Sequence, residues 1–377
     1  MGFELSARYL SLQARAREVA ASVAGQAAAA DESLTADPVM VKALADSELP
    51  ALCVPAAYGG ADEQVDSLAI TVVREALMAT SAHLDGLFAM QAIGSFALSA
   101  AGDKAVQSKW LPRVARLEAI AALALTEPEV GSDLRSVTTA ITEDGDSVVV
   151  TGCKSFITNA GEAAFYTVLG RESSGYSLVL VPATAADVTV QVGPRLIAPH
   201  ILGEVRFDSV RVPASHRIGA PGQAFSLVLA TLATFRVTVA GAAVGLAQAA
   251  LDEAVRHTTG RSQFGKRLSE LGSIPSLLAQ SWLEIEQARA LTYCAASAAA
   301  QDPLASIDLS SMAKVAATET ASRVADRAVQ MMGRFGLVSG SVIERLYRNA
   351  RPMRIYEGGN EALLDQLARR LVKRYAR

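Results

Sequence analysis

The feature that most constrains this chain is a change in hydrophobic periodicity, which occurs twice along its 377 residues. Apolar residues first recur at helical spacing, interrupted by turn residues at Asp37-Pro38 and Gly59-Gly60. A middle stretch alternates Thr and Val with polar residues, and long helical repeats then return. The order predicts a helical domain over residues 1–120, a β domain over 121–220 and a helical bundle over 221–377.

Within these parts the pattern predicts individual elements. The predicted helices are 39–49, 67–80, 104–116, 225–257, 276–299, 305–332 and 361–377. The predicted strands are 136–142, 147–150, 166–169, 177–181, 188–192 and 205–207, with a hairpin signal at Asp144-Gly145. The fold class is therefore α+β, with a central barrel-like or sandwich-like domain and a C-terminal four-helix bundle. Strands and helices do not alternate, which argues against a doubly wound α/β domain.

Composition narrows the class of protein. Hydrophobic residues make up 51% of the chain, and the net charge of −3 gives no electrostatic attraction to nucleic acid or to an anionic membrane. Charged residues interrupt every apolar stretch, and the first residues lack the layout of a signal peptide. Three widely spaced cysteines without a CxxC pair predict core thiols in a reducing cytosol, with no disulfide and no metal site. We expect a soluble cytoplasmic protein.

A dinucleotide bound on a Rossmann unit needs GxGxxG between a strand and a helix, and the chain has none. Gly333 and Gly336 follow a long predicted helix, where helix termination explains them. Any dinucleotide cofactor would therefore need another scaffold.

Six short segments together resemble the acyl-CoA dehydrogenase family, in its order and at about its spacing over nearly the whole chain. The three stronger segments are Ala124-Leu-Thr-Glu-Pro-Glu-Val-Gly-Ser-Asp133, Arg261-Ser-Gln-Phe-Gly-Lys266 and Ile355-Tyr-Glu-Gly-Gly-Asn-Glu361. The three weaker segments are Val54-Pro-Ala-Ala-Tyr-Gly-Gly60, Phe156-Ile-Thr-Asn159 and Ala328-Val-Gln-Met-Met-Gly333. Each alone is a weak signal, whereas six in register are a strong one.

The resemblance implies FAD as cofactor. In it Phe156 covers one flavin face, Thr158 places its hydroxyl near flavin N5, and Ser132 lies close to the thioester. The implied cofactor contacts are Leu123, Leu125, Thr126, Ser132, Phe156, Thr158, Arg261, Gln263, Phe264, Gln330, Gly333, Gly359 and Glu361. The segment that begins at Arg261, together with Gln330 and Gly333, reaches the FAD of a neighbouring subunit in the family, which implies a homo-oligomer.

Removal of a proton α to a thioester needs a carboxylate in a water-poor site, where burial raises its pKa above about 4.3. Glu357 precedes Gly358-Gly359, a turn that permits close approach of substrate and whose backbone N–H groups can polarise a carbonyl. The resemblance assigns the base to Glu357. Some members carry the base immediately before the arginine that matches Arg236, but Phe235 occupies that position here.

The implied reaction converts an acyl thioester to its 2-enoyl form, with electrons passing to an acceptor such as electron-transfer flavoprotein. Arg236 would help to position Glu357, and the expected substrate contacts are Ser132, Phe235, Arg236 and Gly358. The bulk of Phe225 and Phe235 favours a short or compact acyl group.

Several positions depart from the family pattern. Gly359 replaces a threonine, Arg334 a glycine, Leu271-Gly272 a polar pair and Asn349 an aspartate. Each lost hydrogen bond is worth about 1 kcal/mol, so the departures are compatible with weaker retention of FAD and do not imply loss of binding; how tightly FAD is held stays open.

These departures fit a branch that oxidises acyl groups on acyl carrier protein in secondary metabolism. The arginines at 345, 348, 351 and 354 could form a basic rim for an acidic carrier, or a solvated face. The choice between CoA and carrier protein stays open. Two other functions remain: a flavin monooxygenase or oxidase on the same fold, which Glu357 argues against, and a non-catalytic oligomeric scaffold without flavin.

Overall fold

The computed structural model describes residues 4–376, which form two compact units. Of these residues, unit 1 contains 4–31, 67–85 and 233–376, and unit 2 contains 32–66 and 86–232. Each unit is assembled from segments far apart in the chain, so its core depends on contacts that no single segment makes alone.

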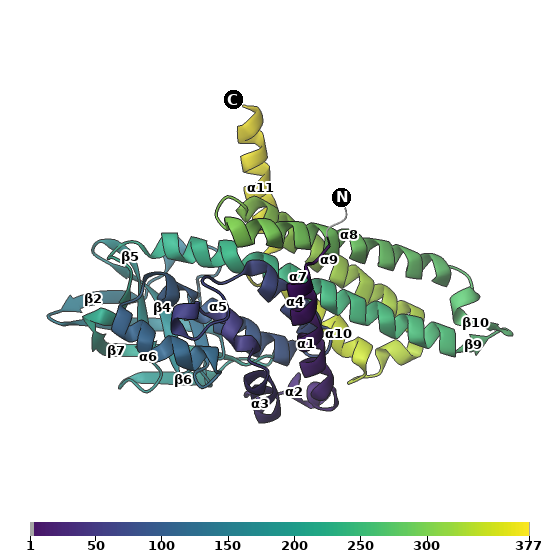
Figure 1. Ribbon diagram of the computed structural model, residues 1–377, viewed down its shortest axis with the longest axis horizontal. Helices are drawn as coiled ribbons and strands as arrows, with labels where there is room; N and C mark the ends of the chain where they lie inside the picture. The colour runs from purple at the N-terminus through teal and green to yellow at the C-terminus, as the bar shows by residue number, and fades with distance from the viewer. Residues whose placement is uncertain (1–3, 377) are drawn as a thin grey trace. The chain divides into compact units, whose positions relative to one another are not determined.

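Helical segments precede and follow a central set of strands, which confirms the predicted fold class (Figure 1). The helices are α1 (Ala7–Ser22), α2 (Ala27–Ala30), α3 (Pro38–Asp46), α4 (Ser67–Met78), α5 (Ala82–Ala101), α6 (Lys104–Ala115), α7 (Ala224–Gly260), α8 (Ile274–Gln301), α9 (Ile307–Met332), α10 (Val342–Ala350) and α11 (Asn360–Tyr375). The strands are β1 (Ala121–Ala124), β2 (Ala140–Asp144), β3 (Ser147–Thr158), β4 (Phe165–Glu172), β5 (Gly175–Pro182), β6 (Val188–Val192), β7 (Leu202–Pro213), β8 (Arg217–Ile218), β9 (Ser262–Gln263) and β10 (Lys266–Arg267).

Most predicted bounds shift by some residues in the structure, and some helices, among them α1, α5 and α10, were not individually predicted. The strand predicted over 136–142 begins only at Ala140, because the N–H groups of Thr138 and Thr139 donate to the Glu127 carboxylate instead of to a strand. Helix α10 was not predicted, although Ser341 and Glu344 at its start form a capping pair. The predicted helix 361–377 is α11, and its last residue, 377, lies outside the described residues.

Unit 2 contains an eight-stranded sheet in the order β6-β7-β3-β2-β4-β5-β8, with β1 pairing in parallel to β4. The predicted hairpin is present. Asp144 pairs with Ser147, so Gly145 and Asp146 form a two-residue turn, and Gly145 has the φ of +59° that such a turn requires.

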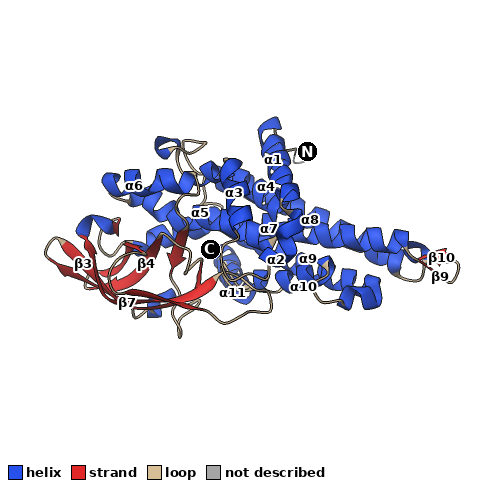
Figure 2. Ribbon diagram, turned by 90° about the horizontal axis from the view of Figure 1, so that it is seen from below, coloured by secondary structure: helices blue, strands red, loops and turns tan. Residues whose placement is uncertain are grey.

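The two faces of this sheet bury different cores because side chains alternate along each strand. Phe165 and Leu169 of β4 pack with apolar residues of α5 and α6, among them Leu98 and Trp110. Tyr166 and the other members of the alternate set face a second core shared with β3 and β7. Figure 2 shows the strands gathered beneath α5 and α6. The helices therefore cover one face of the sheet, and the curved sheet encloses the other core.

Unit 1 is a helical bundle in which residues of α4, α7, α8, α9 and α10 share one alanine-rich core. Helices α4 and α7 approach closely at two glycines. A Cβ atom at Gly241 would lie 2.6 Å from Thr71 O, and one at Gly245 would lie 1.9 Å from Glu75 O. Only residues without a side chain permit this contact, so α7 is held tightly against α4. Arg236 lies on α7 as well, so the close contact between α7 and α4 also fixes the position of Arg236.

Two helices, α5 and α7, are long and apolar enough to span a bilayer by length and composition. In both, most of the apolar window is buried inside the protein, 67% and 78% respectively, as in the core helices of a folded domain.

Candidate active site

Glu357 lies in the turn between the 3₁₀ segment Pro352–Arg354 and α11, and its backbone is strained. Its φ is +55°, a left-handed conformation that is uncommon for residues other than glycine. Gly358 follows with φ +97°, and a Cβ there would lie 3.2 Å from Leu363 Cδ2. Such conformations cost on the order of 1–3 kcal/mol and concentrate at functional sites, where the surrounding structure enforces them.

The structure brings Arg236 to Glu357, as the resemblance implied. Arg236 Nε donates to the backbone carbonyl of Glu357 at 3.1 Å, and Nη1 donates to Ser311 Oγ on α9 at 3.1 Å. The arginine thus holds the backbone of the turn, while Glu357 Oε2 makes no hydrogen bond within residues 4–376.

The Glu357 carboxylate has one oxygen atom without a hydrogen bond in the described chain, and its pKa is raised. Its Oε2 atom is buried and makes no hydrogen bond to any residue from 4 to 376. Burial raises the pKa of Glu357 above its usual value, against the opposing charges of Arg236, Arg74 and Lys314. A carboxylate destabilised in this way is a stronger base than one in water.

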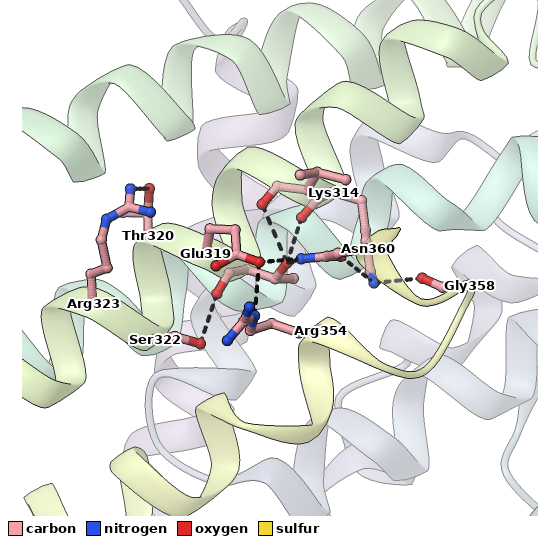
Figure 3. A network of polar contacts seen from close by, with 10 residues as sticks. Lys314, Glu319, Thr320, Ser322, Arg323, Arg354, Gly358 and Asn360 are labelled. Atoms are coloured by element: carbon pink, nitrogen blue, oxygen red, sulfur yellow. Dashed lines mark hydrogen bonds and ion pairs between the residues drawn. The ribbon is translucent and has the colours of Figure 1, made fainter. Parts of the chain in front are cut away.

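The following residues of the turn are anchored to α9 (Figure 3). Lys314 is completely buried, and its Nζ donates to Gly358 O and to Asn360 Oδ1, each at 2.8 Å. Asn360 Nδ2 donates in turn to Thr318 Oγ1 at 3.0 Å and to Glu319 Oε1 at 2.8 Å. The turn is therefore held by side chains of α7 on one carbonyl and of α9 on the next.

In unit 2, the residues predicted to contact the flavin gather where β1 ends beside β3. Thr126 Oγ1 donates to Ser155 O at 2.6 Å, and Ser155 N–H donates back to Thr126 O at 3.0 Å. The register of β3 against β7 shifts between Lys154 and Ile157, and Phe156 within this bulge has φ +55°. Its ring is consequently 58% exposed beside the end of β1.

Other predicted contacts lie along the same elements. Leu123 is half-buried in β1, Leu125 follows the strand, and Thr158 ends β3 half-buried, opposite Leu202. Ser132 is exposed on the loop after Glu127, and the next part of that loop is tied down by the Tyr176 hydroxyl, which donates to Arg135 O. Phe225 packs edge-on against Tyr176, with ring centroids 4.7 Å apart.

A buried ion pair supports this region. The Glu127 carboxylate accepts from Lys154 Nζ at 2.9 Å and from the N–H and hydroxyl groups of Thr138 and Thr139 at 2.6–2.9 Å. Lys154 also donates to Leu125 O at 2.9 Å. These five donors hold the pKa of Glu127 low, at about 2, against the opposing effect of burial. The Glu127–Lys154 pair thereby connects β3 to the segment that follows β1 and to the residues just before β2.

The remaining predicted contacts gather at one end of the bundle. Arg261 begins the β9–β10 hairpin, and its guanidinium lies 4.8 Å from the centroid of the Phe335 ring, just beyond Gly333. Gln263 and Phe264 at the hairpin tip are exposed, Phe264 by 94%, and Gln330 is exposed on α9. The structure thus brings Arg261 together with the segment after Gly333, two regions that the resemblance assigned to one shared role.

The departures from the family pattern have structural counterparts. At Gly359 the nearest atom to a Cβ would be Glu361 Oε2 at 3.8 Å, so a side chain fits there. The Asn349 side chain points to Asp31, with Nδ2 3.5 Å from Oδ2. Phe235 is completely buried on α7.

The basic rim considered for a carrier protein does not form from most of its arginines. Arg345 is buried against Asp31 at 2.7 Å, Arg348 pairs with Glu344 at 2.5 Å, and Arg354 pairs with Glu319 at 2.8 Å. Each of these three guanidinium groups already pairs with a carboxylate of this chain, so they are poor candidates for contacts with an acidic partner.

Sequence reasoning missed the two buried lysines. Lys154 follows Val148 and Val150 on the inward face of β3, and a charge at an inward position requires a partner. Lys314 likewise lies on the buried side of α9, among alanines. The signal in both cases was a charged residue on the apolar side of a periodic pattern.

The residues present fit a flavin. A flavin ring needs apolar cover and polar partners. The exposed Phe156 ring provides cover in unit 2, where the adjacent Ser155 Oγ is buried without a hydrogen-bond partner in the described chain.

The chain matches three family models in order: the acyl-CoA dehydrogenase N-terminal domain over residues 6–118, the middle domain over 122–210 and the C-terminal domain over 222–372. It is 33% identical to the probable acyl-CoA dehydrogenase FadE25 of Mycobacterium leprae, over 98% of this chain and 97% of the relative. It is 32% identical to the cyclohexane-1-carbonyl-CoA dehydrogenase of Geobacter metallireducens, over 94% of each. The structure of butyryl-CoA dehydrogenase from Megasphaera elsdenii superposes with a TM-score of 0.93 at 28% identity, covering 99% of this chain and 100% of that one. This chain therefore belongs to the acyl-CoA dehydrogenase family, whose members are FAD-dependent oxidoreductases of acyl-CoA thioesters.

Proposed function

We propose that this protein dehydrogenates an acyl-CoA between its α and β carbons, with Glu357 as the base. The observation that carries the proposal is the Glu357 carboxylate, whose Oε2 is buried without a hydrogen-bond partner among residues 4–376 in a strained, clamped turn. An unsatisfied buried acceptor is costly, so its retention is best explained by a proton that arrives with the substrate.

In the proposed reaction Glu357 takes the proton from the α carbon of the thioester. When bound, FAD supplies the acceptor, at flavin N5, for the hydride that leaves the β carbon. The two C–H bonds break, the electron pair of the first forms the new double bond, and a trans-2-enoyl thioester results. Protonated Glu357 must then release its proton before the next turnover, and its raised pKa favours holding it until product leaves.

The backbone at the turn supports this role. The N–H of Glu357 donates to no acceptor within the described residues, and the adjoining carbonyl oxygens of Glu357 and Gly358 are occupied by Arg236 and Lys314. A free N–H beside the base suits a thioester carbonyl, whose oxygen gains negative charge as the α proton leaves.

We further propose that the hairpin tip at Gln263 and Phe264 reaches a second copy of the chain, and that Leu123, Leu125, Thr126, Phe156 and Thr158 contact the flavin. Exposure of a phenylalanine by 94% supports a covered position in an oligomer. We also propose a cytoplasmic location and an electron-transfer flavoprotein as electron acceptor. For the carrier, CoA is supported by the relatives and by the internal pairing of Arg345, Arg348 and Arg354.

Flavin bleaching tests the proposal. Purified protein should absorb near 450 nm, and a panel of acyl-CoAs and acyl carrier proteins should identify the thioester that bleaches it. Glu357→Gln should keep FAD and abolish bleaching, whereas Asp365→Asn, which removes an exposed carboxylate from α11, should bleach normally.

A colourless protein, or wild-type bleaching by Glu357→Gln, would refute the proposal. Turnover that needs oxygen and no other electron acceptor, with peroxide release, would instead indicate the oxidase alternative. If only acyl groups carried on acyl carrier protein bleach the flavin, the carrier is that protein and not CoA.

A further inference from the structure

We propose that Lys314 is a positioning residue for Glu357, acting through Gly358 and Asn360; the proposal rests on Glu357 being the base. Lys314 lies on α9, is 0% exposed, and sends its ammonium group to two acceptors at 2.8 Å. One acceptor is the carbonyl immediately after the base, and the other is the first residue of α11.

Both acceptors of Lys314 are uncharged, which is unusual for a buried ammonium group. Within residues 4–376, the acceptors of the Lys314 ammonium group are a backbone carbonyl and a side-chain amide, and neither is a carboxylate. Desolvation accordingly lowers the pKa of Lys314 to about 8, so the lysine is mostly charged at neutral pH. An apolar side chain of similar length would fill the same space at lower cost, so the charge itself needs an explanation.

The geometry supplies that explanation. Arg236 holds the carbonyl of Glu357 from α7, and Lys314 holds the carbonyl of Gly358 from α9. The two peptide planes on either side of Gly358 are thereby fixed from two helices, which holds the φ of +97° at that residue. The first of these planes also follows Glu357, so it fixes one side of the Cα atom that carries the carboxylate side chain.

A second layer fixes both ends of the turn to the same helix. Asn360 is 1% exposed and bridges Lys314 to Thr318 and Glu319. Glu319 Oε1 also accepts from Arg354 Nε at 2.8 Å, just before the turn. Figure 3 shows these side chains converging on Asn360 and Gly358.

The charge of Lys314 also acts on the base. The charged groups that act on Glu357 are Arg236 of α7, Arg74 of α4 and Lys314 of α9, and all three favour its ionised form. Asp85 of α5 neutralises Arg74 through a 2.6 Å ion pair, and the hydroxyl of the neighbouring Tyr356 carries no charge at neutral pH, as for any tyrosine. Arg236 and Lys314 are therefore the main cations that lack a carboxylate partner beside the turn.

The test is the pH dependence of flavin bleaching by the acyl-CoA that the wild type reduces. Lys314→Met should keep bound FAD, slow bleaching on the order of 10- to 100-fold, and move its apparent pKa upward. Lys314→Arg should restore the pH profile at least in part, because it restores the cation. The matched control is Arg323→Met, which removes a cation of the same helix that pairs with Glu284 away from the turn and should leave rate and profile unchanged.

Asn360→Asp tests the charge separately if Lys314→Met does not fold. It keeps the size of the side chain and the acceptor for Lys314, and its negative charge offsets the ammonium group, so the apparent pKa for bleaching should rise; it also loses the donor bonds to Thr318 and Glu319. An unchanged rate and pH profile in Lys314→Met, or an unchanged profile in folded Asn360→Asp, would overturn the positioning role. If Glu357→Gln is inactive in that case, the proposed base survives; if Glu357→Gln is active, the proposed function itself has failed.

Discussion

Replacing Glu127 by glutamine should destabilise unit 2 strongly, although the change alters only one atom of the side chain. The ionised carboxylate has five donors in the fold, and they hold its pKa at about 2 instead of near 4.5. A difference of roughly 2.5 pKa units at about 1.4 kcal/mol each corresponds to about 3.5 kcal/mol. Removal of one partner from a buried ion pair typically costs about 3–5 kcal/mol, in agreement.

The assay is denaturant unfolding followed by the fluorescence of Trp110, which is buried in unit 2 against Phe165 at 5.1 Å. The chain has one other tryptophan, Trp282 in α8, and a Trp282→Phe background removes its signal. Glu127→Gln should lower the free energy of unfolding by about 3.5 kcal/mol at pH 7. Glu118→Gln, which breaks an exposed pair with Arg116, is the control and should have little effect.

The pH dependence has a definite sign. A carboxyl group whose pKa is lowered on folding stabilises the protein above its unfolded pKa, near 4.5, and that contribution is lost as pH falls towards 2. The gap between wild type and Glu127→Gln should therefore close in acid. The double variant Glu127→Gln/Lys154→Met should be less destabilised than the sum of the single variants, because it leaves no unpaired charge. A loss below about 1 kcal/mol for Glu127→Gln at pH 7, or strict additivity, would refute the reasoning.

Two further changes should have measurable effects. Gly359→Thr should tighten FAD binding by about 1 kcal/mol, or roughly fivefold in Kd measured by equilibrium titration. The site has room for the side chain, and the hydroxyl would restore the hydrogen bond that the family resemblance implies. Unchanged or weaker binding would contradict a role for this position in FAD binding. Glu357→Gln should raise the thermal midpoint at pH 8 but not at pH 4, since a carboxyl with a raised pKa loses its contribution to stability as pH rises through that pKa; an equal effect at both pH values would contradict the burial of the ionised carboxylate.

Several elements that depend on local pattern were predicted from the sequence, whereas most side-chain contacts between distant residues were not. Strand β6 has the predicted bounds Val188–Val192, and helices α4 and α6 begin at the predicted residues. The strand before β2 failed because its N–H groups bind Glu127, and no local pattern shows that competition.

In the candidate site, likewise, short segments could be identified from the sequence, but most contacts of their side chains could not. Short segments indicated Glu357 and Arg236, and the structure joins them across 121 positions of the chain. Lys314 and Lys154 lie 46 and 27 positions from their partners Asn360 and Glu127, so their roles depend on packing that periodicity does not describe. The bulge that turns Phe156 outward depends on strand register, which is set by the pairing of β3 with β7.

The anchoring of the turn to α9 limits what can be transplanted. The segment from Arg354 to Asn360 would not keep its shape on another helical scaffold, because its side chains reach inward to Glu319 before the base and to Lys314 after it. Those two partners lie five positions apart on α9, about one and a half helical turns. Transplanting Glu357 with its turn therefore requires a stretch of α9 as well, and directed evolution of the loop alone would leave unchanged the α9 side chains that hold it.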